Sequence, residues 1–512
     1  WTVYPVNRSS GVLLNGERTL AAASLKAGDC IAVGGVEMYF FPSTESDEAK
    51  VARRRVEEQR HRRTSQAGTL VLVNVCQVLL FLQVFLTAQA EDRLSMGVAF
   101  GGLALLSWVL YGIYRAAQRS AYELESLVFL LISIGAAVTA AYDPASLYKL
   151  LITVVMGMVL FLAMSGVLRD LHLSIRARWP VAIAAGALLA FNVVLGERIF
   201  GAKNWISIGP LSFQPSELVK IAFILAGAAT LDRLFAKRNL VFTILFSAYC
   251  VGCLALMSDF GTALIFFVAF LCIAFLRTGD LPSIAMMVAA AAFGCGIILR
   301  FKPYIADRFA AWRHAWDYAQ DIGYQQTRTM SAMASGGLFG VGPKDGWLKY
   351  VGAANTDLVF GVVGEEFGFL LALCCVAALV IPIVFTLRCA AAARSSFYTI
   401  LSCATAAMLV CQMALNVLGA VDLLPLTGVT FPFVSMGGSS MISCWGLMAY
   451  LKAADTRQNA SFALRLSKLA PQQQEKKAAP APKARPKAPQ EGFFADRPDI
   501  PVDKIFGKEE DK

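Results

Sequence analysis

A series of long apolar segments constrains this chain more than any other feature. About twelve such segments follow one another from residue 68, roughly at 68–87, 96–114, 122–141, 148–168, 180–199, 216–234, 240–257, 261–277, 281–300, 359–387, 397–419 and 433–451. An α-helix needs about 20 residues to cross about 30 Å of hydrocarbon. Only 16% of the residues are charged, whereas soluble proteins carry roughly 25%. We therefore predict an all-α polytopic membrane protein with about twelve transmembrane helices.

The charges between these segments predict the topology. Basic residues fall in alternate connections, at Arg115 and Arg119; Arg169, Arg176 and Arg178; Lys237 and Arg238; Arg277; Arg388 and Arg394; and Lys452. The other short connections are acidic or nearly neutral, as at Glu91, Asp92 and Asp143. By the positive-inside rule both ends are cytoplasmic. The net charge of +10 is thus explained by basic residues on the cytoplasmic side of the cytoplasmic membrane. We expect no nucleic-acid partner.

The flanking regions differ from the apolar core. We expect a small β domain at 1–42, a basic cytoplasmic linker at 43–66, two transmembrane helices at 67–120, ten more at 121–454 with a large extracytoplasmic loop at 301–358, and a disordered cytoplasmic tail at 455–512. The tail is rich in Pro, Ala, Lys and Gln, which is typical of disorder. Because the first residue is Trp1 rather than Met, we expect a fragment or a processed form.

The β region contains two turn dipeptides, Asn15-Gly16 and Gly28-Asp29. The pattern around them resembles the second half of a forkhead-associated (FHA) domain, which binds phosphothreonine. Asn15 matches a residue of that family that touches the phosphopeptide backbone, which makes phosphothreonine proteins candidate partners. The family's upstream phosphate contacts have no match here, so a β remnant without binding activity is an equal alternative.

Polar residues gather in two segments on the predicted outer side, 200–215 and 301–358. The longer segment mixes Asp317, Asp321 and other carboxylates with cations and many aromatic residues. Such a mixture suits binding of a charged lipid and activation of a hydroxyl group, or simply a solvated interfacial loop.

Charged residues also lie within or beside the apolar segments. Glu217 and Lys220 are spaced i, i+3 and can pair on one helix face. Asp259, Glu365 and Glu366 each need a partner or a polar cavity, because an isolated charge in a membrane is costly. We interpret Glu365 and Glu366 as mainly structural, and helix capping explains Asp259 about as well as binding does.

Five motifs appear in the order found in one known family. They are Gly201-Ala202-Lys203-Asn204-Trp205-Ile206 with Phe213-Gln214-Pro215-Ser216-Glu217-Leu218-Val219-Lys220; Ser258-Asp259-Phe260-Gly261-Thr262-Ala263; Gly323-Tyr324-Gln325 with Ser335-Gly336-Gly337; Thr356-Asp357-Leu358-Val359-Phe360 with Gly364-Glu365-Glu366-Phe367-Gly368; and Pro432-Phe433-Val434-Ser435-Met436-Gly437-Gly438-Ser439-Ser440. Across about 120–452 the chain resembles the SEDS family of FtsW, RodA and SpoVE. The resemblance implies a ten-helix core, to which the first two helices and the FHA-like segment are additions.

The resemblance also implies an activity. SEDS proteins polymerise lipid II into peptidoglycan glycan strands for division, elongation or sporulation, and they release undecaprenyl diphosphate. The reaction inverts the anomeric centre, so the acceptor hydroxyl needs a general base. The leaving diphosphate needs positive charge, from Lys and Arg or from a divalent ion such as Mg²⁺ or Mn²⁺. The family's usual partner is a class B penicillin-binding protein, a transpeptidase that cross-links the new strand.

The resemblance assigns roles to particular residues. The family's catalytic aspartate precedes the tyrosine by six residues, but here Tyr318-Ala319 replaces the usual Asp-Pro. Asp321 is our preferred base and Asp317 the alternative; a helix through this segment would place both on one face. The candidate substrate-binding residues are Lys203, Trp205, Gln214, Glu217, Lys220, Asp259, Tyr324, Gln325 and Ser435. Lys203-Asn204 stands where the family often has Arg-Arg or Ser-Arg. We expect no protein-built metal centre, because the chain has only three histidines.

Two rival functions remain open. A lipid II flippase would also be a bundle of many helices with buried charges, but it needs polar groups through its whole depth. The sequence concentrates such groups at the outer side. A membrane scaffold that recruits division proteins is the other alternative, and it predicts that Asp317 and Asp321 are dispensable.

Overall fold

The computed structural model describes residues 2–3, 12–19, 23–26, 28–33, 36–40, 65–119, 121–199, 202–208, 211–231, 237–301, 303–391 and 395–455. All of them belong to one compact unit, Trp1–Leu464. The predicted basic linker and disordered tail lie outside the described residues, apart from the few positions at their edges.

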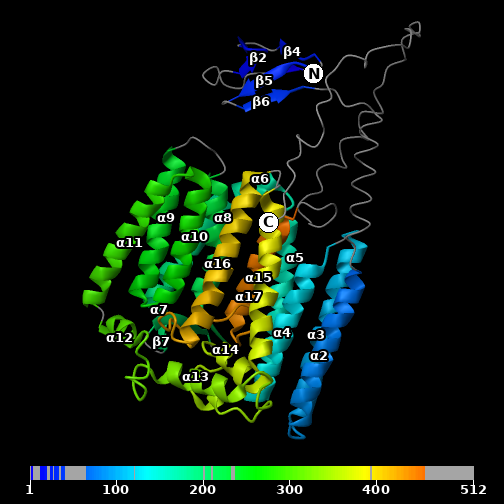
Figure 1. The fold of residues 1–512 in the computed structure, drawn as a ribbon, viewed down its shortest axis with the longest axis vertical. Helices are drawn as coiled ribbons and strands as arrows, with labels where there is room; N and C mark the ends of the chain where they lie inside the picture. The colour runs from blue at the N-terminus through cyan, green and yellow to red at the C-terminus, as the bar shows by residue number, and fades with distance from the viewer. Residues whose placement is uncertain are drawn as a thin grey trace, which may run out of the picture. The chain divides into compact units, whose positions relative to one another are not determined.

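Twelve helices of at least 16 residues form a bundle in the described part of the chain (Figure 1). They are α2 (Gln66–Leu86), α3 (Arg93–Ala116), α4 (Glu123–Tyr142), α5 (Leu147–Val167), α7 (Arg178–Leu195), α8 (Pro215–Leu231), α9 (Lys237–Leu256), α10 (Phe260–Thr278), α11 (Leu281–Phe301), α15 (Phe369–Ala391), α16 (Ser396–Ala420) and α17 (Gly438–Ala453). Eight stretches of helix are long and apolar enough to cross a membrane, and α9 and α11 carry shorter apolar stretches. The predicted fold class, a polytopic helical membrane protein, is confirmed.

Two predicted spans begin later than their apolar sequence indicates. The segment predicted at 359–387 starts as α14 (Val359–Val362) and a π-helical turn (Val363–Phe367), and α15 begins only at Phe369. Gly368 separates them at φ 92°, where a Cβ would lie 2.3 Å from the Leu338 carbonyl oxygen. The other span begins at Gly438 instead of 433. Each break has only a few polar residues, Glu365 and Glu366 in the first and Ser435 in the second, so the mean hydropathy of the surrounding segment does not reveal it.

The centre of the bundle is packed around α17. Trp445 is fully buried, and its ring contacts those of Phe129, Phe161 and Phe433. A Cβ on Gly157 of α5 would lie only 2.5 Å from Trp445 Cδ1. A glycine at this position therefore allows α5 and α17 to approach each other closely.

The first two helices, α2 and α3, form a hairpin that packs against α4 (Figure 1). Near the end of α3, the Tyr114 hydroxyl donates to Glu125 of α4, which also pairs with Lys452 of α17 at 3.0 Å. In the turn between α2 and α3, Asp92 pairs with Lys344 at 3.3 Å. The hairpin is thus attached to the rest of the bundle at both of its ends.

Most of the shorter elements lie at one end of the bundle, here called the loop end. Figure 1 shows β7, α12, α13 and α14 at this end and α6 at the other. Strands β7 (Glu197–Ile199), β8 (Ala202–Ile208) and β9 (Leu211–Phe213) form an antiparallel sheet in that order. The remaining elements are α6 (Leu171–Arg176), α12 (Pro303–Ala311), α13 (Tyr324–Gly336) and the 3-10 turns Pro144–Ser146 and Leu348–Tyr350.

The N-terminal strands form two small antiparallel sheets. One pairs β1 (Thr2–Val3) with β4 (Ala23–Ser24), and the other has the order β3 (Glu17–Thr19), β2 (Val12–Leu14), β5 (Cys30–Val33), β6 (Val36–Tyr39). Asn15 and Gly16 join β2 to β3 at positive φ, as the Asn-Gly pair predicts. The Asn15 amide donates to Asp29 (3.0 Å) and accepts from the Cys30 backbone N–H (2.8 Å). Its side chain thus joins two turns of this domain to each other.

Candidate active site

The loop end brings together polar side chains from five separate segments. Asn204 comes from β8, Gln214 from the residue before α8, Asp259 from the start of α10, Arg308 from α12 and Asp357 from the segment before α14. Up to 153 residues separate them in the sequence, between Asn204 and Asp357. The fold therefore assembles here a cluster that no single motif contains.

Asp259 is held by three hydrogen bonds. Its Oδ1 accepts from the Thr262 backbone N–H (3.2 Å), which caps α10. Its Oδ2 accepts from Asn204 Nδ2 (2.9 Å) and from Gln214 Nε2 (3.0 Å). Asp259 therefore caps α10, as one interpretation predicted, and it also binds the segment that carries the first motif, while its predicted contact with substrate stays a prediction. Asn204 was not among the predicted site residues, although it lies inside that motif.

Asp357 lies beside the segment 426–429. A Cβ on Gly428 would lie 3.2 Å from Asp357 Oδ2, and Asn416 Nδ2 donates both to the Asp357 carbonyl and to that of Val429, each at 2.8 Å. Burial raises the pKa of Asp357 to about 6; a hydrogen bond with Thr356 and the charge of Arg308 oppose this rise, and the charge of Asp259 adds to it. Asp357 belongs to one of the five motifs but was not among the predicted site residues.

The loop that carries α12 is fastened to the segment after α16. Arg308 Nη1 donates to the Leu426 carbonyl (2.9 Å), and Trp312 Nε1 donates to that of Leu423 (3.0 Å). The Asp422 carboxylate accepts from two backbone N–H groups of the loop, at positions 313 and 315. These bonds fix Arg308 beside Asp357.

The two predicted base residues lie on the surface of this loop. Residues 312–323 form successive turns rather than an α-helix, so the expected shared helical face of Asp317 and Asp321 is wrong. Asp317 is 75% exposed and lies 3.4 Å from His314 Nδ1. Asp321 is also exposed, and its carbonyl accepts from the Tyr324 N–H at the start of α13. Neither carboxylate belongs to the cluster around Asp259.

Both predicted lysines are engaged with protein atoms. Lys203 Nζ donates to the carbonyls of Val193 (2.9 Å) and Val194 (3.0 Å), where its charge complements the C-terminal end of α7. Lys220 pairs with Glu217 at 2.8 Å and also donates to Gln412 (3.0 Å). The i, i+3 pairing expected from the sequence is therefore present.

The remaining predicted residues have mixed environments. Ser435 donates to the Thr356 carbonyl (2.6 Å) and accepts from the Phe431 N–H (2.8 Å), so it positions the segment next to Asp357. Gln325 donates to the Gly352 carbonyl (3.0 Å). Tyr324 is exposed beneath the Arg328 guanidinium, and Trp205 is half-buried in β8.

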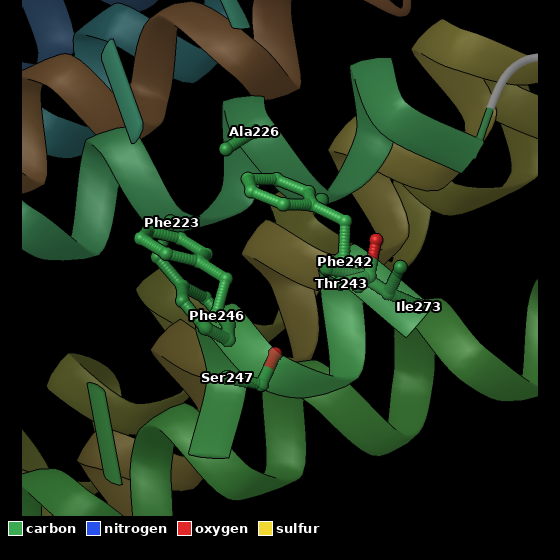
Figure 2. A pocket seen from close by; sticks show the side chains of 8 residues that line it. Phe223, Ala226, Phe242, Thr243, Phe246, Ser247 and Ile273 are labelled. Carbon is green, nitrogen blue, oxygen red and sulfur yellow. The ribbon is translucent and has the colours of Figure 1, made fainter. Parts of the chain in front are cut away.

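Two further features concern possible ligands of the bundle. Within the described ranges, no three His, Cys, Asp or Glu side chains come together to hold a metal ion. A pocket between α8, α9 and α10 (Figure 2) is lined mainly by apolar groups, including Phe223, Phe242, Phe246 and Ile273, and by no charged side chain.

Comparisons with known proteins agree on one family. Over 366 residues the chain is 28% identical to the probable peptidoglycan glycosyltransferase FtsW of Saccharophagus degradans, covering 66% of this chain and 93% of that protein. It is 29% identical over 426 residues to the peptidoglycan glycosyltransferase RodA of Mycobacterium leprae, covering 76% and 90%.

Solved structures show the same relationship. A structure described as the structural coordination of polymerization and crosslinking by a peptidoglycan synthase complex matches at a TM-score of 0.56 and 26% identity. RodA of Thermus thermophilus matches at 0.50 and 25%, and both matches cover 66% of this chain and 98% of the other. The family profile of the FtsW, RodA and SpoVE cell cycle proteins matches residues 121–460. The chain therefore belongs to the FtsW/RodA/SpoVE family.

Proposed function

We propose that this chain is a peptidoglycan glycosyltransferase that polymerises lipid II. The observation that carries the proposal is the cluster at the loop end, where Asp259, Asp357 and Arg308 meet on the scaffold of this family. Carboxylates beside a guanidinium suit a reaction that removes a proton from a hydroxyl and expels a diphosphate. Relatives named as peptidoglycan glycosyltransferases support the same activity.

In the proposed reaction, the 4-hydroxyl oxygen of an acceptor sugar attacks the anomeric carbon of a lipid-linked donor. The new glycosidic C–O bond forms as the bond to the diphosphate breaks, and undecaprenyl diphosphate leaves with the electron pair. A carboxylate accepts the hydroxyl proton, and that proton later passes to water. Attack opposite the leaving group inverts the α-linked donor into a β-1,4 product.

The substrate suggests the orientation of the chain. Lipid II polymers form outside the cytoplasmic membrane, so the loop end would be extracytoplasmic. The basic residues support this orientation, because the connections that carry Arg115, Arg119, Arg169 and Arg176 lie at the opposite end of the bundle. Both termini would then be cytoplasmic, and a class B penicillin-binding protein would supply the cross-linking activity. The match to a synthase complex supports such a partner.

The observations support a lipid II flippase less well than a glycosyltransferase. Buried charge is not confined to the loop end, contrary to our expectation, because Glu125 and Lys452 are buried at the opposite end. These two residues are paired with each other at 3.0 Å. The apolar pocket in Figure 2 adds no charged group between the two ends. Two sets of buried charges, Glu125 with Lys452 and Glu217 with Lys220, are thus separate ion pairs, whereas a flippase needs polar groups through its whole depth.

Polymerisation of lipid II tests the proposal directly. The full chain, purified with its penicillin-binding partner, should convert fluorescent lipid II into a ladder of glycan strands on a gel. Addition of lysozyme, which cleaves the β-1,4 bond, should remove the ladder. Lipid II translocation in proteoliposomes without any polymer would favour the flippase, and absence of both activities would favour the scaffold.

A further inference from the structure

We infer that Asp357 is the residue that accepts the proton of the attacking hydroxyl, in place of Asp317 and Asp321. The inference rests on the proposed function and names the base of that reaction. It starts from the position of Asp357, which lies between α12, the start of α10 and the segment 426–429. Its side chain is half-buried, whereas Asp317 and Asp321 are exposed.

The side chain of Asp357 is partly exposed, and Gly428 places no side chain over its carboxylate. Gly428 adopts φ 69°, is exposed, and presents only a hydrogen where a Cβ would lie 3.2 Å from Asp357 Oδ2. The backbone of Asp357 is fixed by Asn416, while Ser435 fixes the carbonyl of the preceding residue. A proton acceptor needs this combination of a fixed backbone and an accessible oxygen.

Three residues linked to Asp357, Asp259 or Gly428 carry polar atoms without hydrogen-bond partners among the described residues. Asn416 is 1% exposed, and its Oδ1 has no hydrogen-bond partner among the described residues. In the same part of the structure, Asn204 Oδ1 and Thr427 Oγ1 are buried and equally lack partners. Asn204 binds Asp259, and Thr427 adjoins Gly428. Buried polar atoms are rarely left unpaired, so these three are suited to the hydroxyl and amide groups of a sugar.

The electrostatic environment matches the role. The charged groups that face Asp357 are Arg308 from α12 and Asp259 at the start of α10, and burial is the main reason that its pKa rises to about 6. A base with a pKa near the working pH combines ionisation with proton affinity. Asp317 and Asp321, in contrast, are exposed to water on the loop surface.

Asparagine variants test the assignment in the full chain with its partner. Asp357→Asn should lower the rate of lipid II polymerisation by about 100-fold or more, the usual contribution of a general base, while binding of lipid II changes less than about threefold. Asp307→Asn is the matched control, because it removes the charge of an exposed carboxylate of α12 next to Arg308. Its rate should remain within about threefold of the wild type.

The pH profile of the wild type tests the same assignment without any variant. A carboxylate accepts a proton only when ionised, so kcat/KM should fall about tenfold per pH unit below about pH 6 and level off above it. A base exposed to water, with the ordinary aspartate pKa near 4, would shift the fall of kcat/KM to a pH about two units lower. The profile remains decisive if Asp357→Asn does not fold.

The outcomes separate this inference from the proposed function. A wild type that polymerises lipid II while Asp357→Asn retains more than about a third of its rate would overturn the assignment and leave the glycosyltransferase intact. Loss of activity in Asp321→Asn or Asp317→Asn, with Asp357→Asn active, would return the role to the loop. A wild type that makes no polymer with its partner would overturn both proposals.

Discussion

The buried pair of Glu217 and Lys220 gives a prediction with a definite magnitude. The two side chains are 2.8 Å apart, and Glu217 and Lys220 are 4% and 0% exposed. In Lys220→Met the Glu217 carboxylate would stay buried, with the Ser443 hydroxyl as its remaining donor. Removing one partner of a buried ion pair costs roughly 3–5 kcal/mol. At about 1.4 kcal/mol per factor of ten, the unfolded fraction should rise by roughly two to three and a half orders of magnitude.

Equilibrium unfolding in mixed detergent and SDS micelles measures this loss. The double variant Glu217→Gln/Lys220→Met removes both charges, so it should be more stable than Lys220→Met alone by about 2 kcal/mol. Lys149→Met is the matched control, because Lys149 is an exposed lysine of α5, and its cost should stay within about 0.5 kcal/mol. A loss below about 1 kcal/mol in Lys220→Met, with no coupling to Glu217, would refute this account of the pair.

Three further predictions concern packing and anchoring, and the same unfolding measurement checks the first two. Gly157→Leu should cost about 1–3 kcal/mol, because its Cβ would lie 2.5 Å from Trp445, and an unchanged midpoint would contradict the close approach. Tyr114→Phe removes the hydroxyl that donates to buried Glu125 and should cost about 1–3 kcal/mol; a neutral effect would mean that the hairpin does not need this bond. Asp422→Ala leaves two loop amides without their acceptor, so limited proteolysis should cut within 312–323 faster than in the wild type, and equal rates would disprove the anchoring role.

Local sequence patterns predicted local structure well. The spacing of Glu217 and Lys220 predicted their pairing, because residues three apart on a helix are neighbours. The Asn15-Gly16 turn and most helices followed from similarly short-range rules. What the sequence did not reveal depends on contacts between distant residues. Asn204 and Asp259 are 55 positions apart, and their hydrogen bond follows only from the approach of β8 to the turn before α10, where the Lys203 N–H donates to the Met257 carbonyl.

The same distinction between local patterns and distant contacts explains why the predicted base residues differ from the one inferred from the structure. Asp317 and Asp321 stand out in the sequence because they flank the place of the family's aspartate. Asp357 stands in a motif of mostly apolar residues, and its burial depends on α12 and on the segment 426–429. The break before α15 was also missed, because Glu365 and Glu366 interrupt the apolar segment only briefly and only the contact of Gly368 with Leu338 shows where the chain turns.

The hairpin of α2 and α3 has a consequence for assembly. It covers α4, whose apolar window is 83% buried, and it is attached at both ends, by Glu125 and by the pair of Asp92 and Lys344. A membrane anchor from another protein therefore finds no free surface on α4. In a synthase complex, such an anchor would have to bind one of the more exposed helices, such as α7, whose window is 22% buried. Helices α2 and α3 thus restrict the directions from which a partner can approach within the bilayer.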